Sequence, residues 1–127
     1  MARILIIEDN PTNMKLVVFL LEKEGHEVLQ ATDAEEGISV ARDRLPELIL
    51  MDVQLPGMDG LAATRLLKGD AATCGIKIVA LTAFAMTGDR EKIKTAGCDG
   101  YIAKPIRYQE FLKVVGEMIV GAGSGTS

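Results

Sequence analysis

The chain has 127 residues, of which 48% are hydrophobic and 25% charged, a balance typical of one globular domain with a real core. A net charge of −4 without a long basic run argues against nucleic-acid binding, and no apolar stretch reaches the roughly 18 residues of a membrane span. Two cysteines and one histidine are too few for a disulfide framework, a four-ligand zinc site or a histidine-based metal cluster. We therefore expect a cytoplasmic protein with reduced thiols, in which His26 is a solvated loop residue.

The first two predicted elements are a strand and a helix. Residues 3–7, RILII, form a short apolar run that ends at two acidic residues. Residues 10–25 have a helical pattern, in which Asn10 can cap the start, Pro11 suits the first turn and Gly25 ends the helix. The side chains expected to face the core are Met14, Val17, Val18 and Leu21.

A second strand and helix follow, and then a third strand. Residues 27–32 are less apolar than the other strands, which suits an edge of the sheet. Residues 33–44 are predicted to form a helix capped by Asp33. Its inward positions are Ala34, Ile38 and Ala41. The strand at residues 47–52 runs through four apolar residues directly into Asp52.

The second half of the chain continues this alternation. The predicted helices are residues 59–70, 87–96 and 108–120, and the predicted strands are residues 76–82 and 100–105. The helix at residues 87–96 is polar and is closed by Gly97. The last helix is expected to bury Phe111, Leu112, Val115, Met118 and Ile119. Residues 1–120 are therefore expected to form one domain, and residues 121–127 a flexible tail that is either a linker or a cloning remnant.

The order of these elements predicts the fold class. Near-continuous apolar strands that alternate with amphipathic helices indicate an α/β protein whose parallel sheet is covered on both faces. Five strand-helix repeats fit the flavodoxin-like, doubly wound sheet with strand order 2-1-3-4-5. In this topology ligands bind beyond the carboxyl ends of the first and third strands, which here carry Glu8, Asp9 and Asp52.

Polar residues at four strand ends are expected to meet at this edge. They are Glu8, Asp9, Asp52, Thr82 and Lys104. Three carboxylates at close range repel one another unless a cation neutralises them, and one lysine cannot balance all three. Oxygen ligands without histidine or cysteine select a hard cation, and Mg²⁺ needs only one or two carboxylates because it keeps several waters. The residues therefore predict a Mg²⁺ site.

This combination of groups is suited to phosphoryl chemistry. A metal ion and Lys104 can stabilise charge on phosphoryl oxygens, and Thr82 can donate a hydrogen bond to them. Asp52 can act as the nucleophile, as carboxylates do in enzymes that form an aspartyl phosphate.

Four motifs then give the chain a family resemblance. They are IIEDN at 6–10, LILMDVQLPGMDG at 48–60, VALTAFA at 79–85 and GYIAKPI at 100–106. In this order and spacing they resemble the response-regulator receiver domain of two-component signalling over nearly all of residues 3–120. The resemblance implies that Asp52 is the phosphoacceptor and that Glu8, Asp9, Asp52 and the Gln54 backbone carbonyl hold Mg²⁺. It also implies that Lys104 pairs with the phosphoryl group.

The resemblance further implies a switch and an output surface. Thr82 would be the switch hydroxyl, Tyr101 the switch aromatic that turns inward, and the Lys104–Pro105 bond would be cis. The surface expected to change lies on the helix at 87–96, the strand at 100–105 and the last helix. It includes Ala85, Met86, Arg90, Ile106, Arg107 and Tyr108.

The expected partners are a histidine kinase or histidine phosphotransfer protein and a downstream protein target, without nucleic acid or membrane. The chain would be no enzyme beyond its own phosphorylation and dephosphorylation. A phosphohydrolase of the haloacid-dehalogenase type needs an acid at position 54, where this chain has Gln54. A flavin mononucleotide carrier is disfavoured by the acidic EDNPTN segment after the first strand. A non-phosphorylated interaction module, or pseudo-receiver, stays as the alternative, and both a free-standing regulator and a hybrid-kinase receiver fit the motifs.

Overall fold

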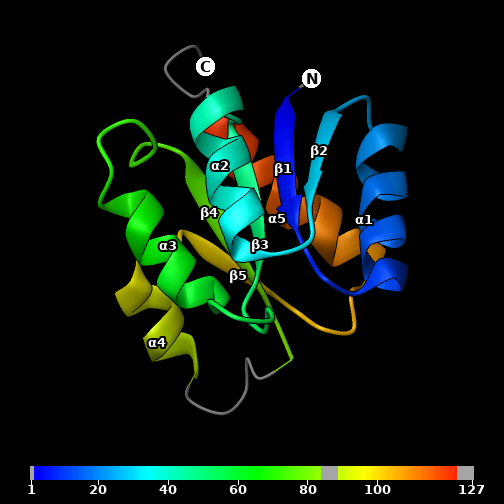
Figure 1. Cartoon of the computed structure of the whole chain (residues 1–127). Coiled ribbons are helices and arrows are strands. Elements are labelled where there is room, and N and C mark those ends of the chain that lie inside the picture. The colour runs from blue at the N-terminus through cyan, green and yellow to red at the C-terminus, as the bar shows by residue number, and fades with distance from the viewer. Residues whose placement is uncertain (1, 84–88, 123–127) are drawn as a thin grey trace.

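Strands and helices alternate throughout the part of the chain that this computed structural model describes, residues 2–83 and 89–122 (Figure 1). The strands are β1 (Arg3–Ile7), β2 (Glu27–Ala31), β3 (Leu48–Asp52), β4 (Lys77–Thr82) and β5 (Gly100–Ala103). The helices are α1 (Pro11–Lys23), α2 (Ala34–Arg44), α3 (Gly60–Lys68), α4 (Asp89–Ala96) and α5 (Tyr108–Ala122). The strands are all parallel in the order β2-β1-β3-β4-β5, which confirms the predicted flavodoxin-like sheet.

Helices cover both faces of the sheet and give the protein two core layers. Successive residues of a strand point to opposite faces. In β1, Ile4 and Ile6 pack with α1 and α5, whereas Leu5 and Ile7 pack with α2 and α3. Every residue of β3 is buried, because this strand lies at the centre of the sheet. The near-continuous apolar strands are thus explained by burial on both sides.

The helix starts follow local capping chemistry. The Asn10 side chain accepts hydrogen bonds from the backbone N–H groups of Thr12 and Asn13, at 2.9 and 3.0 Å. Asp33 and Asp59 accept equivalent bonds at the starts of α2 and α3. The predicted caps Asn10 and Asp33 are therefore confirmed, and these caps set where each helix leaves the carboxyl end of the preceding strand.

Most predicted core positions are buried, with differences in α1 and α5. In α1, Leu20 is buried although the sequence pattern did not select it, and Val18 is only half-buried. In α5, Phe111 and Val115 are buried as predicted, but Leu112, Met118 and Ile119 are only half-buried because they lie at the margin of the core. The polar α4 lies beside α3, and the expected start of this helix at residue 87 lies outside the described residues. Among the described residues, no helix is long and apolar enough to cross a membrane.

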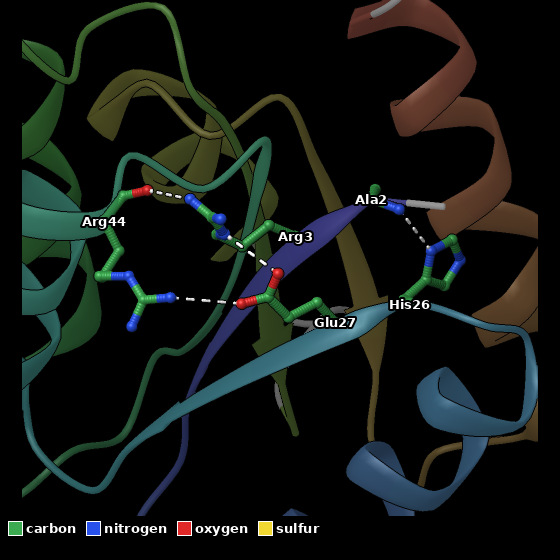
Figure 2. Close-up of polar contacts among 5 residues, drawn as sticks. All are labelled: Ala2, Arg3, His26, Glu27 and Arg44. Carbon is green, nitrogen blue, oxygen red and sulfur yellow. Dashed lines mark hydrogen bonds and ion pairs between the residues drawn. The ribbon is translucent and has the colours of Figure 1, made fainter.

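A network of polar contacts lies at the amino ends of β1 and β2 (Figure 2), at the opposite end of the sheet from Glu8, Asp9 and Asp52. The Arg3 guanidinium donates to the Arg44 carbonyl at 2.9 Å, and the carboxylate of Glu27 lies 3.4 and 3.3 Å from the side chains of Arg3 and Arg44. His26 was predicted to be a solvated loop residue; it does lie in the loop before β2, but it is not fully solvated. Its side chain is half-buried, and its Nδ1 accepts a hydrogen bond from the Ala2 backbone N–H at 3.1 Å.

Candidate functional site

The carboxyl ends of β1, β3, β4 and β5 place the predicted site residues along one edge of the sheet. Parallel pairing sets Asp52 opposite Leu81 and Thr82 opposite Ala103. Backbone hydrogen bonds extend the pairing one residue past the strands, since Glu8 N–H donates to Ala31 and Lys104 N–H donates to Thr82. The backbone that carries the site residues is therefore fixed by the hydrogen bonds of the sheet.

An ion-pair triad lies at the centre of this edge. Lys104 Nζ is 3.1 Å from Glu8 Oε1 and 3.2 Å from Asp52 Oδ2. Backbone N–H groups bind the other oxygens, because Asn10 donates to Glu8 Oε2 at 3.1 Å and Gln54 donates to Asp52 Oδ1 at 3.0 Å. Both carboxylates are almost fully buried, so each has a fixed orientation.

The ionisation of Asp52 reflects this crowded environment. Burial, together with the nearby Glu8 carboxylate, raises the pKa of Asp52 from 3.8 to about 6, although the Gln54 N–H and the Lys104 ammonium act in the opposite direction. Burial disfavours the charged form of Lys104, but Glu8 and Asp52 outweigh it and raise the pKa of this lysine. Asp52 is therefore mostly an anion at pH 7, held against a permanent cation.

The same carboxylates form a candidate metal site. One oxygen each from Glu8, Asp9 and Asp52 lie within 4.8 Å of one another, and Asp9 is exposed while the other two are buried. Glu8 Oε1 is buried and accepts no hydrogen bond within the described part of the chain, although Lys104 is its ion-pair partner. An all-oxygen set of three carboxylates with a buried acceptor to spare is suited to a hard divalent cation.

The loop after Asp52 is fixed by a residue that sequence analysis did not select. Gly60 donates its N–H to the Val53 carbonyl at 3.0 Å, and a Cβ at Gly60 would collide with the backbone carbonyl of Asp52. Only glycine fits this contact without movement of the backbone. In the sequence, Gly60 was visible only as the last residue of the motif LILMDVQLPGMDG, and its Asp-Gly pair is also an ordinary turn signal.

The two predicted switch residues lie on neighbouring strands. Thr82 is at the end of β4, next to the triad, and Tyr101 is on β5, farther from the triad. Thr82 is 1% exposed. Tyr101 is half-buried on β5, and the Arg90 guanidinium of α4 lies 5.3 Å from the centre of its ring. The Lys104–Pro105 bond is cis, as predicted.

The predicted output surface is only partly accessible. Arg90, Arg107 and Tyr108 are exposed, and Ile106 packs partly against the core. Ala85 and Met86 lie outside the described residues. A pocket of about 350 Å³ between α4 and β5 adjoins this surface. It is lined by Arg90, Ile93, Lys94, Cys98, Asp99, Gly100 and Tyr101.

Comparisons with known proteins agree with the fold and with the family resemblance. Residues 4–116 match the family model described as response regulator receiver domain. The chain is 44% identical to the polar-differentiation response regulator DivK of Brucella anthropi over 112 residues, which cover 88% of this chain and 91% of that protein.

Two solved structures extend the likeness to the backbone. The receiver domain of the sensor histidine kinase PA1611 from Pseudomonas aeruginosa superposes with a TM-score of 0.87 at 35% identity, covering 93% of this chain and 97% of that one. Its crystal structure has a magnesium ion coordinated in the active site cleft. The receiver domain of a signal transduction histidine kinase from Syntrophus aciditrophicus superposes with a TM-score of 0.88 at 30% identity, covering 95% of this chain and 92% of that one.

Proposed function

This chain belongs to the response regulator receiver domain family, and from that premise we propose that Asp52 accepts a phosphoryl group from a phosphohistidine. The donor is a histidine kinase or a histidine phosphotransfer protein. The observation that carries the proposal is the buried Asp52 carboxylate, which faces Lys104 at 3.2 Å and is oriented by the Gln54 N–H. Receiver domains are signalling switches and not classical enzymes, and the chemistry proposed here is confined to this chain's own aspartate.

We assign the binding of Mg²⁺ to Glu8, Asp9, Asp52 and the backbone carbonyl of Gln54. The clustered carboxylate oxygens and the spare acceptor on Glu8 support this assignment, as does the magnesium ion of the Pseudomonas aeruginosa receiver domain. When bound, the ion supplies positive charge beside the phosphoryl oxygens.

The residues of the chain provide the rest of the reaction. An Asp52 oxygen forms a new bond to phosphorus while the bond between phosphorus and the donor's imidazole nitrogen breaks, and the electron pair of that bond stays with the imidazole. A pKa of about 6 leaves Asp52 ionised and ready to attack at pH 7. Lys104 lies within ion-pair distance of the attacking carboxylate, so its ammonium is placed to stabilise the phosphoryl oxygens.

The acyl phosphate then acts on the switch residues. Thr82 ends the strand next to Asp52, and its hydroxyl can donate a hydrogen bond to the new phosphoryl oxygens. Movement of Thr82 would let Tyr101 turn inward from its place under Arg90. The phosphoryl group has contacts in only one of the two arrangements, so it shifts the population toward that arrangement. A downstream protein then reads the altered surface of α4, β5 and α5.

The test is phosphorylation by a small donor, read by intact-mass spectrometry. The protein is incubated with acetyl phosphate or phosphoramidate, with Mg²⁺ or with EDTA. Asp52→Asn removes the acceptor, and Asp43→Asn, an exposed aspartate on α2, is the matched control. We expect the wild type and Asp43→Asn each to gain one phosphoryl group from the donor with Mg²⁺ and none with EDTA. A folded wild type that takes no phosphoryl group from either donor would contradict the proposal and favour a pseudo-receiver, and an adduct on Asp52→Asn would exclude Asp52 as the acceptor.

A further inference from the structure

The outer face of α1 carries the most exposed aromatic side chain among the described residues. Phe19 is 61% exposed, and Leu16, one turn earlier, is 38% exposed. Lys23 lies beside Phe19, with its Nζ 6.0 Å from the ring centre, and the ring stays mostly exposed. Large exposed apolar side chains beside a groove are typical of an interaction surface.

A groove lies next to Phe19, where α1 meets the edge strand β2. Its volume is about 260 Å³, and it is lined by Met14, Lys15, Val18, Phe19, Glu22 and Gln30. Met14 and Val18 give it an apolar floor, and charged side chains lie on its rim. Among the described strands β2 is an edge of the sheet, so no further strand covers the groove on that side.

The charges on this rim have opposite sign at its two ends. Lys15, Val18, Phe19 and Glu22 have the i, i+3, i+4, i+7 spacing of a single helix stripe. The cation lies toward the start of α1 and the anion toward its end, at equal distances along the sequence from the midpoint between Val18 and Phe19. If two copies of this helix pack antiparallel about a two-fold axis through that midpoint, Lys15 of one copy lies opposite Glu22 of the other, and Val18 lies opposite Phe19.

We infer that the occupant of this groove is α1 of a second copy of this chain, packed antiparallel across a two-fold axis. Phe19 of each copy enters the groove of the other and packs on its Val18, while Lys15 of each copy pairs with Glu22 of the other. An interface of this kind is isologous, in which one patch serves both subunits. The self-complementary stripe favours a second copy over an unrelated protein, since a heterologous partner requires no such symmetry of charge.

The association is expected to be weak. One helix stripe and a small groove bury less surface than a stable interface needs, so the dissociation constant should be on the order of 10⁻⁴ M. The interface uses neither Asp52 nor Mg²⁺, so its presence or absence is independent of the proposed phosphorylation.

The test measures self-association of the full chain by sedimentation velocity from about 10 µM to about 1 mM, a range that brackets that constant. Lys15→Glu and Glu22→Lys each place like charges at both symmetric contacts, and each should weaken association at least about tenfold. The double variant Lys15→Glu with Glu22→Lys re-forms opposite pairs and should restore the wild-type constant within about threefold. Phe19→Ser should abolish association.

Two controls make the outcome specific to α1. Leu66→Ser changes an exposed leucine on α3, 48% exposed, and should leave the dissociation constant unchanged. Asp52→Asn should also leave it unchanged. A wild type that stays monomeric throughout the range, a double variant that fails to recover, or a Phe19→Ser variant that still dimerises would overturn the inference.

Discussion

Gly60, the first residue of α3, lies directly against the backbone carbonyl of Asp52, the last residue of β3, with no room for a side chain between them. The N–H of Gly60 also donates to the carbonyl of Val53 at 3.0 Å. The two contacts fix the backbone that follows Asp52. Because Gln54 uses that backbone to orient the Asp52 carboxylate, Gly60 acts on the site through the loop and not by contact with the reacting atoms.

We expect Gly60→Ala to lower the free energy of unfolding by about 2 kcal/mol, since the added methyl group can be accepted only if the loop or α3 moves. Urea unfolding of the two proteins measures the difference. Gly75→Ala is the matched control, because a Cβ at Gly75 meets nothing within 4 Å, and it should change stability by no more than about 0.5 kcal/mol. Equal stability of the two variants would show that the loop accepts the methyl group.

The ionised Asp52 is predicted to destabilise the metal-free protein. Its pKa in the folded chain is about 6, above the 3.8 of an unperturbed aspartate, so the folded state binds the proton more tightly than the unfolded state. Stability is therefore lost as pH rises from about 4 through about 6. Asp52→Asn does not titrate and should be more stable than the wild type by about 2 kcal/mol at pH 7.5 in EDTA.

Denaturant unfolding at pH 4.5 and pH 7.5 tests this sign. The free energy of unfolding of Asp52→Asn should exceed that of the wild type only slightly at pH 4.5 and by more at pH 7.5. Added Mg²⁺ should narrow this difference by binding the folded wild type more tightly than the variant. An advantage that is independent of pH would mean that Asp52 does not titrate in this range.

The fold was largely predictable because its signals are local. The apolar run from Ile4 to Ile7 needs burial on both faces, Asn10 and Asp33 supply caps, and Gly25 and Gly97 adopt the positive φ angles of helix-ending glycines. These features determine strand and helix positions without knowledge of tertiary contacts. The strand order follows from the number of repeats and from the acidic residues at two strand ends.

What the sequence did not reveal depends on contacts between distant segments. Leu20 is buried by packing that the helical pattern alone does not specify, and His26 meets the start of β1 only because β1 and β2 are neighbours. The convergence of Glu8, Asp52 and Lys104 was predicted from the topology and is observed, with distances that only the structure provides. The switch roles of Thr82 and Tyr101 stay predictions.

The hydrogen bond between Ala2 and His26 gives a second pH dependence (Figure 2). Burial lowers the pKa of His26 below 6.5, so the unfolded chain binds its proton at a higher pH than the folded chain does. Stability should therefore fall as pH drops below 6.5, because protonation of Nδ1 removes the acceptor for the Ala2 N–H. His26→Gln does not titrate, so its stability should fall less than that of the wild type between pH 7 and pH 5. Parallel stability curves for the two proteins would contradict this.

Lys104 is predicted to set the ionisation of Asp52. In the described part of the chain it is the cation within ion-pair distance of both Glu8 and Asp52. Lys104→Met leaves two buried carboxylates without it, which should raise the pKa of Asp52 further above about 6 and lower stability by about 3 kcal/mol at pH 8. Carbon-detected NMR titration of the Asp52 carboxyl group measures the pKa directly.

The control for this change is Lys68→Met, which removes a lysine of similar burial that pairs with Asp99 at 2.9 Å, away from the triad. Both variants lose an ion pair and gain an apolar side chain, but only Lys104→Met should move the titration of Asp52. The stability lost by Lys104→Met should also shrink between pH 8 and pH 5, because protonation of Asp52 relieves its repulsion with Glu8. An unchanged Asp52 titration in Lys104→Met would mean that burial and Glu8 alone determine this carboxyl's pKa, and that Lys104 is free to act only on the phosphoryl group.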